Sequence, residues 1–170
     1  MIRKGLLAIF GAIAAILSAP GAATAQIETS VGTFAPSVTV TSNYLFRGIS
    51  QTERGPAVQG NLEYTYNVGM VTPYLGAFMS NVQFPDGSFG SLRQRLEVDF
   101  FGGVRIEPID KFVLDFGGIT YLYPTNTVEK NPTPQGVGNP QWNEVYGKAS
   151  YDFGLVKLVG SVFYTAHFSA

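Results

Sequence analysis

The segment from Leu92 to Arg105, LRQRLEVDFFGGVR, alternates between two kinds of side chain with a period of two. The mostly apolar set is Leu92, Leu96, Val98, Phe100 and Val104, and the mostly charged set is Arg93, Arg95, Glu97, Asp99 and Arg105. Because successive side chains of a β-strand point to opposite sides, this pattern predicts a strand with one apolar and one charged face. Strands in soluble proteins usually have about 5–6 residues, whereas a tilted strand needs roughly 9–11 to cross a bilayer.

Two environments accept such a strand: a soluble sandwich with its core on the apolar side, and an outer-membrane barrel with lipid outside and a wet lumen inside. Six further segments share the alternation. The seven predicted strands are Ser37–Arg47, Ala57–Tyr66, Val71–Ser80, Leu92–Arg105, Phe112–Leu122, Trp142–Phe153 and Leu155–Phe168, after a polar lead-in, Gln26–Phe34.

The connections between these strands alternate long, short, long, short, long, short. Outer-membrane barrels have short periplasmic turns and longer extracellular loops, and a sandwich has no reason to keep that rhythm. Aromatic residues also gather at apolar strand ends, as interfacial girdles do; the pairs are Tyr44 with Phe46, Tyr64 with Tyr66, Tyr151 with Phe153, and Tyr164 with Phe168. The sequence therefore favours an all-β fold, an antiparallel transmembrane β-barrel with up-and-down topology.

The composition agrees with this preference. Only 14% of the residues are charged, against about 25% in soluble domains. The net charge of −1 argues against nucleic acid as a partner, and the absence of cysteine excludes a disulfide framework.

The N-terminus has the pattern of a secretory signal peptide. Arg3 and Lys4 precede a short apolar run, Gly5–Leu17, and Ala23-Thr24-Ala25 supplies a cleavage site. The run is shorter than the roughly 20 apolar residues of a spanning helix. We expect a signal peptide over residues 1–25, a barrel domain over residues 26–170, and the bacterial outer membrane as the location. Bacterial single-chain barrels have an even number of strands, so either a strand lies in Gln26–Phe34 or, as we prefer, this chain is the N-terminal portion of a longer protein.

The segment VTVTSNYLFRGISQTERGPAVQGNLEYTY (Val38–Tyr66), with YLGAFMSNVQF (Tyr74–Phe84) after it, resembles the TorF-type porins of proteobacteria. A looser similarity continues through Tyr146–Gly154. The resemblance implies a porin-like outer-membrane protein without an assigned substrate. Members usually carry an acidic residue where this chain has Gln83, and they continue through further strands after a position like Phe168.

The charged residues of the predicted strands are the candidate functional residues. On the lipid side each Arg or Lys would cost about 2–4 kcal/mol at mid-membrane, so we expect these side chains to face inward. The predicted lumen-lining residues are Glu63, Arg93, Arg95, Glu97, Asp99, Asp115, Glu144, Lys148 and Lys157, and Arg47 and Arg54 flank the first outer loop at the channel mouth. In a wide barrel these charges would line a channel, and in a narrow one they would pair across the lumen as filler.

Catalysis and metal binding find little support. The single histidine, His167, has no partner in a catalytic pattern, and no His/Cys cluster suggests a metal site. We therefore expect no enzyme activity, no metal and no cofactor. The predicted function is passive diffusion of small polar solutes or ions, with outer-membrane lipid as the surroundings; the alternative is a narrow, non-conducting barrel with a structural or surface-binding role through its loops.

Overall fold

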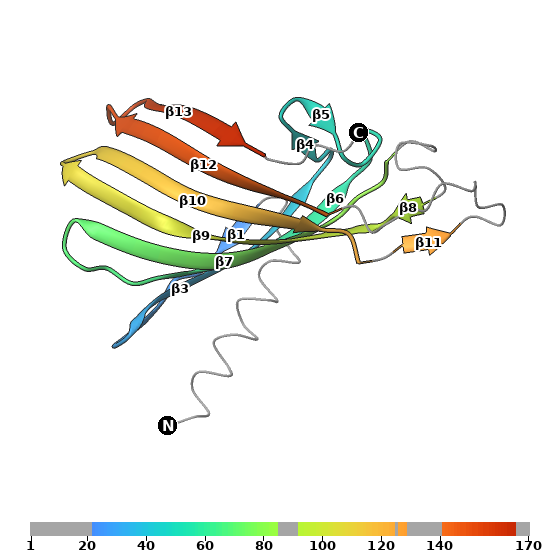
Figure 1. Cartoon of the computed structure of the whole chain (residues 1–170). Coiled ribbons are helices and arrows are strands. Elements are labelled where there is room, and N and C mark those ends of the chain that lie inside the picture. The colour runs from blue at the N-terminus through green and yellow to red at the C-terminus, as the bar shows by residue number, and fades with distance from the viewer. Residues whose placement is uncertain (1–21, 85–91, 125, 129–140, 166–170) are drawn as a thin grey trace, which may run out of the picture.

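The computed structural model describes residues 22–84, 92–124, 126–128 and 141–165, and most of these residues lie in one curved, twisted antiparallel sheet (Figure 1). Its long strands are β3 (Gly32–Thr41), β6 (Ala57–Thr65), β7 (Val71–Asn81), β9 (Leu96–Ile109), β10 (Phe112–Leu122), β12 (Gln141–Asp152) and β13 (Lys157–Tyr164). Long strands that are consecutive in the chain pair with each other in the sheet. The predicted all-β antiparallel meander is confirmed. The described residues contain no helix long and apolar enough to cross a membrane.

The N-terminal edge of the sheet differs from the prediction. Two short strands, β1 (Ala22–Thr24) and β2 (Ile27–Thr29), pair in succession with β3, so the predicted polar lead-in contains a strand. The hydroxyl of Thr29 donates to the Gly32 carbonyl oxygen at 2.7 Å and stabilises the turn from β2 into β3. The first long strand therefore begins at Gly32 and ends at Thr41, and the predicted range Ser37–Arg47 is wrong.

The segment predicted as one strand from Leu92 to Arg105 is divided in two. Its start, β8 (Leu92–Gln94), leaves the main sheet and pairs with β11 (Asn126–Val128) in a separate ribbon. At the break, the carbonyl oxygen of Arg95 accepts a hydrogen bond from the Val82 amide at 3.1 Å. The remainder, β9, continues past Arg105 to Ile109. Because β8 pairs with β11, far along the chain, the strand that belongs to the main sheet begins at Leu96, later than local sequence predicts.

The connections sort by length to opposite ends of the sheet (Figure 1). The short ones, residues 66–70, 110–111 and 153–156, lie at one end, which we call the turn end. The described parts of the long ones, residues 42–56, 82–84, 92–95, 123–124 and 126–128, lie at the other, which we call the loop end. Loop 42–56 contains its own hairpin, β4 (Leu45–Phe46) with β5 (Ile49–Ser50). A small cluster of buried residues packs at the loop end: Val82, Tyr121 and Tyr123, with Tyr44, Phe46, Phe84 and Ile119 against it.

The sheet is open in this structure. Among the strands described, β13 pairs only with β12, and at the opposite edge β3 is flanked by β1 and β2. No pairing between these strands joins the two edges. The predicted closure into a barrel is thus not observed within this chain, because the curvature of its long strands does not bring β13 to the β1–β2 edge.

Candidate functional site

The two faces of the sheet have the reverse polarity of a soluble domain. One face, which we call the polar face, carries Glu97 and Asp99, each only 3% exposed. The other, the apolar face, carries Leu75, Phe116 and Val162, which are 61%, 53% and 74% exposed. Soluble proteins bury apolar side chains and seldom bury carboxylates, and a large exposed apolar area marks a surface that contacts lipid or protein.

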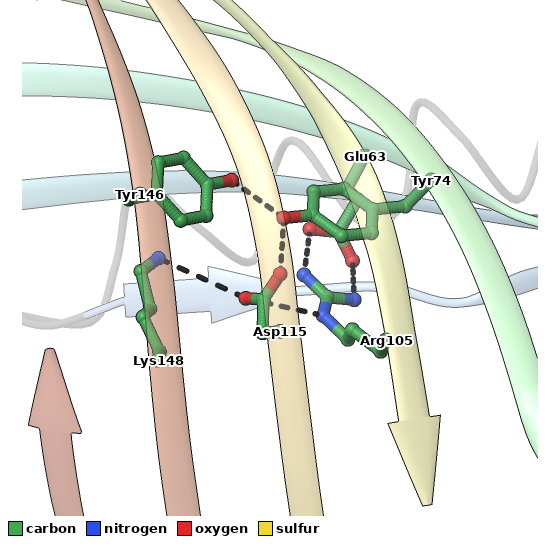
Figure 2. Close-up of polar contacts among 6 residues, drawn as sticks. All are labelled: Glu63, Tyr74, Arg105, Asp115, Tyr146 and Lys148. Atoms are coloured by element: carbon green, nitrogen blue, oxygen red, sulfur yellow. Dashed lines mark hydrogen bonds and ion pairs between the residues drawn. The ribbon is translucent and has the colours of Figure 1, made fainter. Parts of the chain in front are cut away.

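A pair of glycines lies between two tyrosines at the centre of the polar face. In register, Tyr74 of β7 lies opposite Gly103 of β9, Gly103 opposite Gly117 of β10, and Gly117 opposite Tyr146 of β12. A Cβ atom on Gly103 would come within 2.7 Å of the Tyr74 hydroxyl oxygen, and one on Gly117 within 2.5 Å of the Tyr146 hydroxyl oxygen. The glycines therefore leave room for the rings to extend over the sheet until their hydroxyl groups hydrogen-bond to each other (Figure 2).

Four charged side chains from four strands form a continuous chain of ion pairs beside these tyrosines (Figure 2). Both terminal nitrogens of Arg105 donate to the Glu63 carboxylate at 2.7 Å, a bidentate pair. The Arg105 Nε and the Lys148 Nζ lie 3.9 Å and 3.8 Å from the same oxygen of Asp115. The Tyr74 hydroxyl donates to the other Asp115 oxygen at 2.5 Å. We call Glu63, Arg105, Asp115 and Lys148 the four-strand ion network.

Each charge of this network is compensated. The Arg105 guanidinium lies 4.0 Å from the centre of the Tyr74 ring, and the Lys148 ammonium lies 4.0 Å from that of Tyr146. Two cations face two anions, so the network carries no net charge. Paired charges of this kind stabilise one arrangement of the strands, and they create little field for selecting ions of one sign.

A second group of polar side chains lies at the loop end of the same face. The two carboxylate oxygens of Glu97 accept hydrogen bonds from the hydroxyl groups of Tyr44 and Tyr123, each at 2.6 Å. Burial, and after it the charge of Glu97, raises the pKa of both phenols. Both tyrosines therefore stay protonated and keep donating to the carboxylate.

Loop 42–56 is tied to the sheet through Arg47. Its two terminal nitrogens donate to the two carboxylate oxygens of Glu144 on β12, at 3.0 Å and 2.5 Å, and this hydrogen bonding raises the pKa of Arg47. Tyr121 donates to the same carboxylate at 3.0 Å. The guanidinium also lies over the rings of Phe46 and Phe163, at 4.6 Å and 4.3 Å. The loop is thus held over the polar face by contacts between residues 97 positions apart in sequence.

Residues of the segment NYLFRGISQTE (Asn43–Glu53) form hydrogen bonds within loop 42–56 and to Gln83. The Thr52 hydroxyl donates to the Gly55 carbonyl at 2.6 Å and accepts from the Tyr44 amide at 3.2 Å. The amide of Gln83 donates to the Gln51 carbonyl at 2.7 Å, and the Gln83 side chain donates to the Glu53 carboxylate at 2.6 Å. The segments Val38–Tyr66 and Tyr74–Phe84 therefore contact each other. A carboxylate in place of Gln83 would lack the donor that this contact uses.

The structure brings most of the predicted lumen-lining residues to one face. The residues on the polar face are Glu63, Glu97, Asp99, Asp115, Glu144 and Lys148, and Lys157 lies on the same side at the turn end, exposed. Arg95 is exposed at the break before β9, and the side chain of Arg93 lies outside the described part of the chain. The prediction that one uninterrupted strand carries these arginines together with Glu97 and Asp99 is wrong, because β8 pairs elsewhere.

The predicted mouth residues behave differently from each other. The side chain of Arg47 contacts Glu144 on the polar face, whereas Arg54 is exposed in the same loop. The predicted position of Tyr44 in a membrane-interface girdle is wrong, because its hydroxyl is bound to Glu97 inside the polar face. His167 lies outside the described residues.

Sequence reasoning missed the residues that join the charged groups. Arg105, at the centre of the ion network, lies on the charged side of its predicted strand but was not placed among the candidates. Tyr74 and Tyr146 each occupy positions whose alternation indicates the polar side. The feature that could have identified these residues is the placement of tyrosines opposite glycines on adjacent strands. It can be recognised only when the register of the strands is known.

The described residues hold no group of three or more His, Cys, Asp or Glu side chains placed to bind a metal ion. No curated protein and no solved structure matches the chain. A family model described as "Bacterial protein of unknown function (Gcw_chp)" matches residues 25–169, most of the sequence. This chain therefore belongs to the Gcw_chp family of bacterial proteins.

Proposed function

We propose that the chain forms the wall of a bacterial outer-membrane β-barrel and acts as a porin-like channel for passive diffusion of small polar solutes or ions. The observation that carries the proposal is the reversed polarity of the sheet, with buried carboxylates on one face and exposed aliphatic side chains on the other. In a bilayer the apolar face would contact acyl chains, and the polar face would line the lumen. The description of the family assigns no function. The resemblance to the TorF-type porins supports the proposal.

The dimensions of the strands support this placement. β7 has 11 residues, β9 has 14 and β12 has 12. A tilted strand needs roughly 9–11 residues to cross a bilayer. With short turns toward the periplasm and long loops outside, the turn end would lie on the inner side of the membrane. The rings of Tyr151 and Phe153, 4.6 Å apart at the turn end, suit the membrane–water interface there.

Export is the second part of the proposal. The family match begins at residue 25, where the predicted signal peptide ends, and this agreement supports cleavage after Ala25. Cleavage would remove β1, which consists of Ala22–Thr24, and leave β2 as the partner of β3 on that side.

Closure requires partners for both edges of the sheet. Strands paired to β13 on one side and to the β2–β3 edge on the other would complete the barrel. The number of strands would then determine the diameter of the lumen. Whether the polar face encloses a conducting channel depends on that diameter.

A labelling experiment tests the orientation of the two faces. Because the chain contains no cysteine, a single introduced cysteine gives a unique attachment site. We expect a fluorophore at Leu75→Cys, on the apolar face, to be quenched by brominated lipid, and one at Ser37→Cys, on the polar face, to be quenched by aqueous iodide instead. Quenching of the Ser37 probe by lipid, or a protein that stays soluble without detergent, would exclude the proposed membrane position.

Conduction is tested separately in planar bilayers. With the sheet closed into a barrel, the protein should give discrete current steps, and the same detergent with heat-unfolded protein should give none. The second candidate function is a narrow, non-conducting barrel with a structural or surface-binding role. It is favoured by the Arg47–Glu144 tie, which holds loop 42–56 over the polar face. A correctly oriented but electrically silent protein would select this candidate.

A further inference from the structure

A cavity of about 590 Å³ lies at the loop end, between the polar face and loop 42–56. One wall, from β3 and β6, presents hydroxyl and amide groups; its residues are Thr39, Thr41, Gln59 and Asn61. The adjoining wall, from β7, β9 and β10, is aromatic and acidic; its residues include Phe78, Asp99, Phe101 and Tyr121. The cavity is large enough for a small organic molecule, which would meet two chemically different walls.

Aromatic rings surround the single carboxylate that lines this cavity. In the register of the sheet, Asp99 lies directly between Phe78 of β7 and Tyr121 of β10. Loop 42–56 adds two further rings: Tyr44 packs against Phe78 with centroids 5.9 Å apart, and Phe46 packs against Tyr121 at 5.7 Å. A carboxylate among ring faces is the arrangement that binds organic cations, since both the charge and the ring quadrupoles attract them.

Asp99 differs from the neighbouring carboxylates because one of its oxygens has no hydrogen-bond partner in the described structure. Both oxygens of Glu97 accept hydrogen bonds from tyrosines, and both oxygens of Glu144 accept from Arg47. The Oδ1 atom of Asp99, a residue 3% exposed, has no hydrogen-bond partner among the residues that the structure describes. A buried carboxylate oxygen without a partner is energetically costly. A cation that enters the cavity would remove that cost.

We infer that this cavity is a binding site for a small organic cation, with Asp99 as the counter-ion and the surrounding rings as the cage. A coordinated metal ion fits less well, because it would need several oxygen ligands around one point. The hydroxyl and amide wall would accept a polar group at the other end of the same ligand. The inference deepens the proposed function by naming a solute class, and it rests on that function only where transport is concerned.

Titration with choline and with its neutral carbon analogue, dimethylbutanol, tests the site. The two probes have nearly the same shape and the same hydroxyl group, and only choline carries a charge. For the full chain folded in detergent, we expect calorimetry to show saturable binding of choline and no comparable binding of the analogue. Equal binding of both probes, or no saturable choline binding, would overturn the inference.

Three variants locate the binding. Asp99→Asn should weaken choline binding by about 30-fold or more, because it removes a buried counter-ion. Phe78→Leu should weaken it by about 3–10-fold through loss of one ring face. Asp110→Asn, at an exposed turn position, makes the same change in net charge and should leave binding unchanged. Circular dichroism checks that each variant is folded, and retention of full affinity in folded Asp99→Asn contradicts the site.

The outcome is distinguishable from failure of the channel. Binding is measured without a bilayer, so choline binding together with electrical silence would reject conduction and keep the site. Discrete currents that choline does not block, in a protein that does not bind choline, would keep the channel and reject the site.

Discussion

The polar face contains two charged regions that differ in how completely they are paired. In the four-strand ion network, every charged group comes from a regular strand and lies beside an opposite charge. At the loop end, Arg47, Tyr44 and Tyr123 come from connections, and Asp99 keeps an oxygen without a partner in the described structure. Groups that satisfy one another define a structure, whereas an unsatisfied buried group beside a cavity points to a ligand. We therefore expect substitutions in the network to change stability most, and we propose ligand recognition at the loop end.

Removal of Arg105 is the strongest test of the structural role of the network. We expect Arg105→Ala to lower the free energy of unfolding by about 3 kcal/mol, because Glu63 and Asp115 would lose their shared cation. This value lies at the lower end of the range for breaking a buried ion pair, because the Arg105 side chain is 33% exposed. Urea unfolding in detergent measures the change. Arg54→Ala, at an exposed loop position, is the control and should change the value by less than about 0.5 kcal/mol.

The glycine pair between Tyr74 and Tyr146 gives the second prediction. Gly103→Ala should lower the free energy of unfolding by about 2 kcal/mol, because the new methyl group would collide with the Phe116 carbonyl oxygen and the Tyr74 hydroxyl. Gly160→Ala is matched to it, since a Cβ there meets no atom within 4 Å. If both variants unfold at the same urea concentration, the close packing of tyrosines over the network is refuted.

Release of loop 42–56 should have a smaller effect on stability and a larger one on local exposure. Arg47→Ala should cost only about 1 kcal/mol, because the Arg47 side chain is 44% exposed. It should, however, speed tryptic cleavage after Arg54. Glu144→Gln breaks the same ion pair without altering the loop sequence and should act in the same direction. Faster cleavage in the first variant alone would show that the loop is not held through Glu144.

The smallest expected effect has the opposite sign. Asp99→Asn should raise the free energy of unfolding by about 0.5–1 kcal/mol, because an amide is easier to bury without a partner than a carboxylate. Asp115→Asn, in the ion network, should instead lower it, since Arg105 and Lys148 would lose an anion. Urea unfolding of the two variants side by side measures both changes. A loss of stability in both would remove the distinction between the two regions.

Local sequence was sufficient to locate most of the long strands, though not all of their ends, and to predict which side of a strand a residue occupies. Alternation with a period of two follows from the covalent geometry of an extended chain, so Glu63, Asp115 and Lys148 could be assigned to one face without knowledge of their neighbours. The alternation of long and short connections likewise predicted the meander, because antiparallel neighbours need only a short link.

Tertiary structure decided which of these residues meet. The break at Arg95 depends on pairing between β8 and β11. The contact of the Arg47 side chain with the polar face depends on Glu144, nearly a hundred residues later. The opposition of Tyr74 to Gly103 depends on strand register, which is a property of two segments together. The alternating pattern also cannot predict whether the sheet closes. A period of two specifies which face a side chain occupies and contains no information about the curvature that would join the edges.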